Sequence, residues 1–84
     1  MDTKPPRTVT EMTAVVVSEA MTDAGLTVLG VADRTGIPRT TLTRRLSGGS
    51  PFTVAELDTL AAVVGVPVSV IIARAEDRLV GAAA

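Results

Sequence analysis

The feature that most constrains the fold of this chain is the placement of two helix-breaking residues between positions 28 and 46. Gly36 and Pro38 interrupt a stretch whose apolar residues otherwise recur with the helical period. Glycine accepts the positive φ that ends a helix in a tight turn, and proline fits only near the start of a helix because it has no amide hydrogen to donate. The sequence therefore predicts one helix that ends at Gly36 and a second that spans residues 38–47.

Capping residues and glycines place the remaining helices. Thr8 with Glu11, and Thr53 with Glu56, match the capping box, in which a hydroxyl and a carboxylate satisfy backbone amides at the start of a helix. Together with the glycines and prolines between them, these signals predict an all-α bundle of five short helices. The expected helices lie at about 9–24, 27–36, 38–47, 53–65 and from 67 onward.

The chain length of 84 residues allows one small domain. We expect a flexible N-terminal arm at 1–7, the domain at 8–80 and a C-terminal tail at 81–84. No secretory signal is visible, and the longest uncharged run, 59–73, is shorter than the roughly 20 residues of a membrane span. The expected location is the cytoplasm of a bacterial host cell, with the nucleoid and without membrane association.

The composition removes most chemistry from consideration. The chain has no Cys and no His, which excludes thiolate and imidazole catalysis and the common zinc sites. Phe52 is the only aromatic residue, so the stacking platforms of most single-strand and RNA binders are missing. We therefore expect no metal, no cofactor and no enzymatic activity, whereas duplex DNA remains a plausible ligand.

The positive charge is concentrated in one segment. The formal net charge is −1, yet residues 34–50 contain no acidic residue and four arginines: Arg34, Arg39, Arg44 and Arg45. Such a block can hold phosphates locally while the acidic remainder repels them, which favours one orientation on DNA. Taken alone, the arginines could equally be a solvated helix face.

The helix at 38–47 is expected to present a polar face. At about 100° per residue, Leu42 and Leu46 project from one side, opposite a polar arc. The arc consists of Arg39, Thr40, Thr43, Arg44 and Ser47. A helix fits the major groove of DNA, where arginine pairs with guanine and threonine contacts a base or a thymine methyl group. Arg39 and Arg44 are the leading candidates for base contacts.

The neighbouring residues allow more than one role. Thr40 and Thr43 could reach bases or phosphates, and Arg34 could bind phosphate or complement the dipole of its own helix. Thr41 and Arg45 fit either DNA-backbone contacts or pairing within the protein. The candidates for DNA-backbone contacts are Thr41, Arg45, Ser47, Gly48, Ser50 and Arg34. The glycine-rich stretch at 47–50 could instead be only a loop.

These residues resemble the Cro- and lambda-repressor-like helix-turn-helix family, also called the xenobiotic-response-element type. The matching positions are Val31-Ala32, Thr35-Gly36-Ile37, Thr41-Leu42-Thr43-Arg44, Ser47-Gly48, Leu60-Ala61 and Val64-Gly65-Val66-Pro67. The resemblance covers roughly residues 9–73 and implies a compact five-helix lambda-repressor-like bundle. It places Arg39, Thr40 and Arg44 at base-contacting sites and Thr43 at a neighbouring one. One departure is Val28, where many members have a Gln that helps to hold a phosphate.

The expected function is that of a sequence-specific transcriptional regulator of phage or prophage repressor type, which binds a double-stranded DNA operator. The resemblance also implies a possible homodimer, because members of the family usually bind pseudo-palindromes as dimers, one helix reading too few bases. The last helix offers Val70, Val80 and the alanines at 82–84 for self-association, although this end could simply be frayed. The alternative is an antitoxin-like or anti-repressor module, whose protein partner covers the arginine face.

Overall fold

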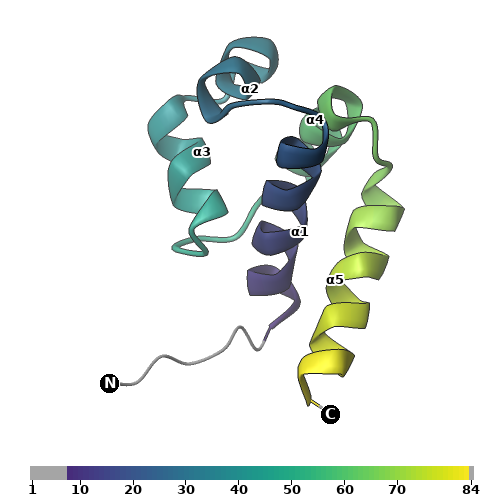
Figure 1. Cartoon of the computed structure of the whole chain (residues 1–84). Helices are drawn as coiled ribbons and strands as arrows, with labels where there is room; N and C mark the ends of the chain where they lie inside the picture. Colours follow the sequence, from purple (N-terminus) through teal and green to yellow (C-terminus); the bar gives the residue numbers. More distant parts are fainter. Residues whose placement is uncertain (1–7, 84) are drawn as a thin grey trace.

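A computed structural model describes residues 8–83, which form a bundle of five α-helices (Figure 1). The helices are α1 (Val9–Asp23), α2 (Val28–Thr35), α3 (Arg39–Leu46), α4 (Val54–Val64) and α5 (Val68–Ala83). The predicted all-α, five-helix class is confirmed. The predicted arm at 1–7 lies outside the described residues, and α5 continues through positions 81–83, which the sequence assigned to a tail.

The predicted caps explain where these helices begin. The Thr8 hydroxyl accepts a hydrogen bond from the Glu11 amide at 3.1 Å, and the Thr8 amide donates to the Glu11 carboxylate at 3.2 Å. Thr53 and Glu56 repeat this arrangement at 3.0 and 2.9 Å. Both capping boxes are therefore present, and each satisfies amides that the first turn of a helix leaves without a partner.

Every helix contributes to one hydrophobic core. The largest fully buried side chains come one from each element in order along the chain: Val17, Val31, Leu42, Leu60 and Ile71. α1 is central in this packing, since it contacts α3, α4 and α5. Its β-branched run at 15–17 has low helix propensity, and burial of Val16 and Val17 compensates for it.

α1 and α5 pack along each other with the most extensive interface of the molecule (Figure 1). Arg78 on α5 donates two hydrogen bonds to the Glu19 carboxylate on α1. Both side chains are nearly half exposed. Such an exposed pair contributes about 0–1 kcal/mol, so apolar packing is what holds the two helices together.

No single helix among residues 8–83 combines the length and the apolar character needed to cross a membrane. Within the same range, no three His, Cys, Asp or Glu residues are grouped closely enough to hold a metal ion.

Candidate nucleic-acid interface

The turn between α2 and α3 is fixed by the side chain of Thr35. Its hydroxyl donates to the Val31 carbonyl at 2.8 Å and accepts from the Ile37 amide at 3.2 Å. Gly36 has a φ of 78°, in the left-handed region that favours glycine. Pro38 caps α3 without a side-chain hydrogen bond. These residues set the angle at which α3 leaves α2.

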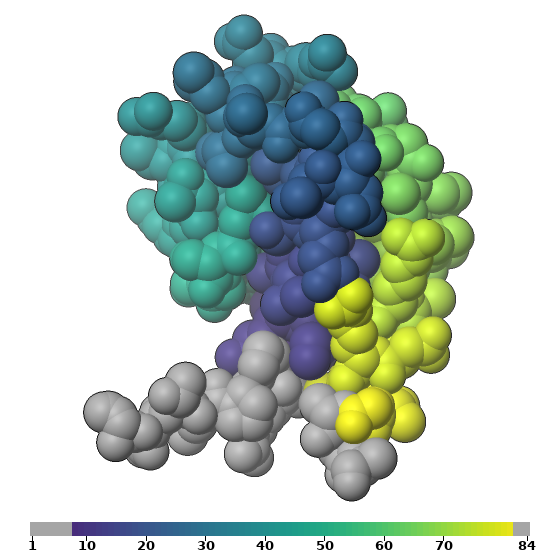
Figure 2. Space-filling view, in the orientation of Figure 1, coloured from purple at the N-terminus to yellow at the C-terminus, as the bar shows by residue number. Residues whose placement is uncertain are grey.

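α3 has one inward and one outward face. Leu42 is fully buried, and Leu46 is partly buried against the core. The exposed residues are Arg39, Thr40, Thr43, Arg44 and Ser47, which form the predicted polar arc. α3 lies at one flank of the molecule, away from α5 (Figures 1 and 2). The polar arc is therefore open to solvent.

The arginines of the basic segment differ in their partners. Within the described residues, the side chains of Arg34, Arg39 and Arg44 are exposed and form no hydrogen bond or ion pair. Their guanidinium groups keep all five donors available for a ligand. This arrangement suits the recognition of guanine or phosphate, which both accept paired hydrogen bonds from arginine.

Arg45 is instead engaged within the protein. Its Nε and Nη2 atoms donate to the two carboxylate oxygens of Glu56 at 2.9 and 3.1 Å, and Nη1 donates to the Ser50 hydroxyl at 2.9 Å. The Arg45 and Glu56 side chains are only 18% and 17% exposed. Of the two roles that the sequence left open for Arg45, pairing within the protein is present. This network joins the end of α3 to the start of α4.

The Arg45 network predicts a pH-dependent contribution to stability. The hydrogen bond from Arg45 holds the pKa of Glu56 below its usual range. A carboxyl whose pKa is lower in the folded state stabilises the fold above its unfolded pKa and loses this effect as the pH falls through the folded value. We expect Glu56→Gln to lower the melting temperature at about pH 7 by roughly 2–8 °C. As the pH is lowered from about 7 to about 2, the melting temperature of the variant should fall less than that of the native protein.

Glutamine retains the oxygen that caps α4, so this substitution isolates the pairing with Arg45. The matched control is Asp58→Asn, which removes the charge of an exposed carboxylate on the same helix. If the melting temperatures of the native protein and of Glu56→Gln fell equally with pH across this range, the stabilising role of the Arg45–Glu56 pair would be contradicted.

The backbone after α3 supports Arg44. The Ser47 hydroxyl and the Gly49 amide both donate to the Arg44 carbonyl, at 2.9 and 3.0 Å. A Cβ atom at Gly49 would lie 3.3 Å from Cγ of Arg44, closer than side chains normally pack. The sequence offered this stretch as DNA-backbone contacts or as only a loop, and missed that Gly49 makes room for the Arg44 side chain.

We expect Gly49→Ala to weaken duplex binding by about 2- to 10-fold, because the added Cβ atom crowds Cγ of Arg44 and shifts its side chain. The measurement is a titration of labelled duplex DNA with the purified variant. Gly81→Ala is the matched control, since a Cβ atom there meets nothing within 4 Å. An equal affinity for Gly49→Ala and the native protein would show that Arg44 is not positioned in this way.

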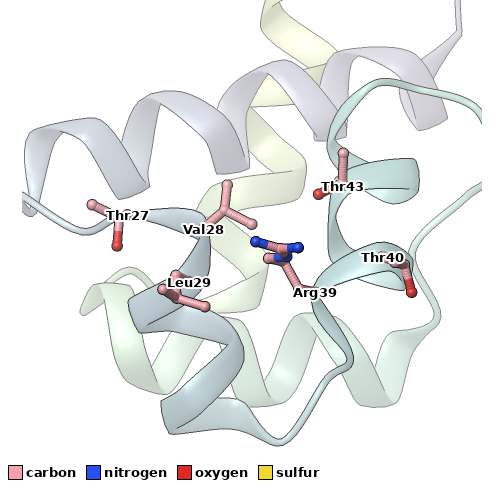
Figure 3. A pocket seen from close by; sticks show the side chains of 6 residues that line it. All are labelled: Thr27, Val28, Leu29, Arg39, Thr40 and Thr43. Atoms are coloured by element: carbon pink, nitrogen blue, oxygen red, sulfur yellow. The ribbon is translucent and has the colours of Figure 1, made fainter.

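A shallow groove of about 570 Å³ separates the start of α2 from the outward face of α3 (Figure 3). Its lining residues are Thr27, Val28, Leu29, Arg39, Thr40 and Thr43. The Arg39 guanidinium lies between Val28 and Thr43, whereas Thr40 points away from it (Figure 3). Arg39 therefore lies at the edge of this groove. Arg44, the other leading candidate for base contacts, lies on the same helix.

Comparisons with known proteins agree with this geometry. A helix-turn-helix family model matches residues 17–71, which include all of α2, α3 and α4. No curated protein matches the sequence. The crystal structure of the clp gene regulator ClgR from Corynebacterium glutamicum has the same fold, with a TM-score of 0.86 and 16% identity over 94% of this chain and 84% of that chain. The chain belongs to the Cro- and lambda-repressor-like helix-turn-helix family and is a DNA-binding transcriptional regulator.

Proposed function

We propose that the protein is a sequence-specific repressor of phage or prophage type, which inserts α3 into the major groove of a double-stranded operator. The observation that carries this proposal is the polar arc of α3, with two exposed arginines that have no partner among the described residues. The long side chains of Arg39 and Arg44 extend from the arc, so α3 can approach base edges without a change in the bundle.

Each residue of the arc has a proposed role. Arg39 and Arg44 each donate two hydrogen bonds to O6 and N7 of a guanine. Thr40 and Thr43 contact a base or a neighbouring phosphate. The proposed DNA-backbone contacts come from Thr41, Ser47, Gly48 and Arg34. Arg45 and Ser50 were expected to contact the DNA backbone as well, and we now propose that they position α3 through Glu56 instead.

We propose that repression works by occupancy of the operator. A protein that covers an operator excludes polymerase and needs no activating surface. One recognition helix reads too few bases for high specificity, so we propose a dimer that places two α3 helices about 34 Å apart on a pseudo-palindrome. Val80 is 71% exposed on α5 and, with the partly buried Val70, offers apolar surface for that contact. The spacing of half-sites in the bound sequence tests the dimer.

The dependence of binding on salt tests the DNA-binding proposal before any operator is known. The electrostatic part of duplex binding does not depend on sequence, so a random-sequence duplex pool suffices as the probe. If each copy neutralises two to four phosphates, affinity should fall on the order of 10- to 100-fold between about 50 and 200 mM salt.

The same titration addresses the alternative of an antitoxin-like or anti-repressor module. A partner protein that covers the arginine face would also bind with some dependence on salt, so the discriminating result is whether a duplex binds at all. Absence of duplex binding even at the lowest salt would contradict the repressor proposal and favour the protein-interaction module.

A further inference from the structure

The groove beside Arg39 has an apolar wall that the base-reading arc does not explain. Val28 and Leu29, the first two residues of α2, form this wall. Leu29 is 63% exposed and is one of three large apolar side chains with such exposure in the described part of the chain. An exposed leucine normally needs no explanation, but this one adjoins the face that we propose to contact DNA.

The polar rim of the groove is the proposed DNA interface itself. Arg39 and Thr43 face the apolar wall from α3 (Figure 3), and no acidic residue lines the groove. In the proposed orientation, a guanine whose edge meets Arg39 places its neighbouring base pair on the side of Val28 and Leu29. The basic, polar rim of the groove suits a polyanionic ligand, and its apolar wall suits an apolar group on that ligand close to the guanine.

Among the groups on the floor of the major groove, the C5-methyl group of thymine is the apolar one. We propose that Val28 and Leu29 contact the methyl group of a thymine adjacent to the guanine that Arg39 reads. This inference rests on the proposed function and makes the start of α2 a specificity determinant. The operator should then contain a thymine next to this guanine in each half-site.

Removal of the methyl group alone tests the proposal. Deoxyuridine replaces thymidine, one position at a time, in a duplex recovered by selection from a random pool. At one thymine next to a guanine, we expect the replacement by deoxyuridine to weaken binding by about fourfold, which is the effect of one buried methyl group. A duplex with 5-methylcytosine paired with guanine at the same position should bind more tightly than one with cytosine.

Variants of the wall connect this effect to its residues. In Leu29→Ala and in Val28→Thr, the penalty for deoxyuridine should shrink, because the methyl group no longer meets a complete apolar wall. Leu29 is largely exposed, so its substitution should leave the melting temperature nearly unchanged. Val54→Ala is the matched control: Val54 is 78% exposed at the first position of α4, and the penalty should remain fourfold.

Two results would overturn the inference while leaving duplex binding intact. One is tolerance of deoxyuridine at every position next to a guanine, which would show that the wall contacts no thymine methyl group. The other is an unchanged penalty in both Leu29→Ala and Val28→Thr. Failure to select any duplex would instead refute the proposed function, so the two failures are distinguishable.

Discussion

Leu42→Ala is expected to lower the free energy of unfolding by about 2–5 kcal/mol. Leu42 is the fully buried side chain of α3, whereas Leu46 is only partly buried against the core. Its truncation removes apolar contacts and leaves a cavity between α3 and the helices that support it, α1 and α2. For a domain that is expected to have only about 5–10 kcal/mol of stability, this loss is large. Urea denaturation followed by circular dichroism measures it.

Leu29→Ala is the matched control for this prediction, since it makes the same chemical change at an exposed position. Its effect on unfolding should stay within about 0.5 kcal/mol. Equal stability of Leu42→Ala and Leu29→Ala would contradict the conclusion that Leu42 anchors α3 in the core. Duplex affinity should be compared only at temperatures at which each variant is folded.

Arg39→Ala and Arg44→Ala should each weaken binding to the selected operator by about 1–3 kcal/mol, or roughly 5- to 150-fold. Each substitution removes a guanidinium that has no partner among the described residues. The fold should therefore be unaffected while one guanine position loses its specificity. Duplex titrations with each of the four base pairs at that position measure both effects.

Arg74→Ala, an exposed arginine on α5, controls for the loss of one positive charge. It should change operator affinity little and should leave base preference intact. Arg45→Ala provides a second comparison, because it should lower stability through loss of the Glu56 pair. Native affinity and selectivity in both Arg39→Ala and Arg44→Ala would exclude them as base-contacting residues.

Local signals were sufficient to predict the helices. The capping boxes and Gly36 act within a few residues of each other, so the sequence alone places the starts of α1 and α4 and the turn before α3. The polar arc was likewise predictable, because it depends only on helical periodicity. The DNA contacts of the individual site residues remain predictions.

Long-range contacts were not predictable in the same way. Arg44 and Arg45 are adjacent and chemically identical. In the part of the chain that the structure describes, Arg45 is paired and Arg44 is not, because the fold places Glu56, eleven residues after Arg45, beside the Arg45 guanidinium. The tight space around Gly49 depends on the Arg44 rotamer, and the groove at Leu29 depends on the angle between α2 and α3. Neither quantity can be read from residue types and spacing.

Selection of bound sequences from random duplexes, with the native protein and the Arg39→Ala/Arg44→Ala variant in parallel, tests the central claim most directly. If α3 reads DNA with its polar arc, the native protein should enrich one motif with guanines at fixed positions, and the variant should lose preference at those guanines. Enrichment of no motif by the native protein, or of the same motif by both proteins, would contradict this account.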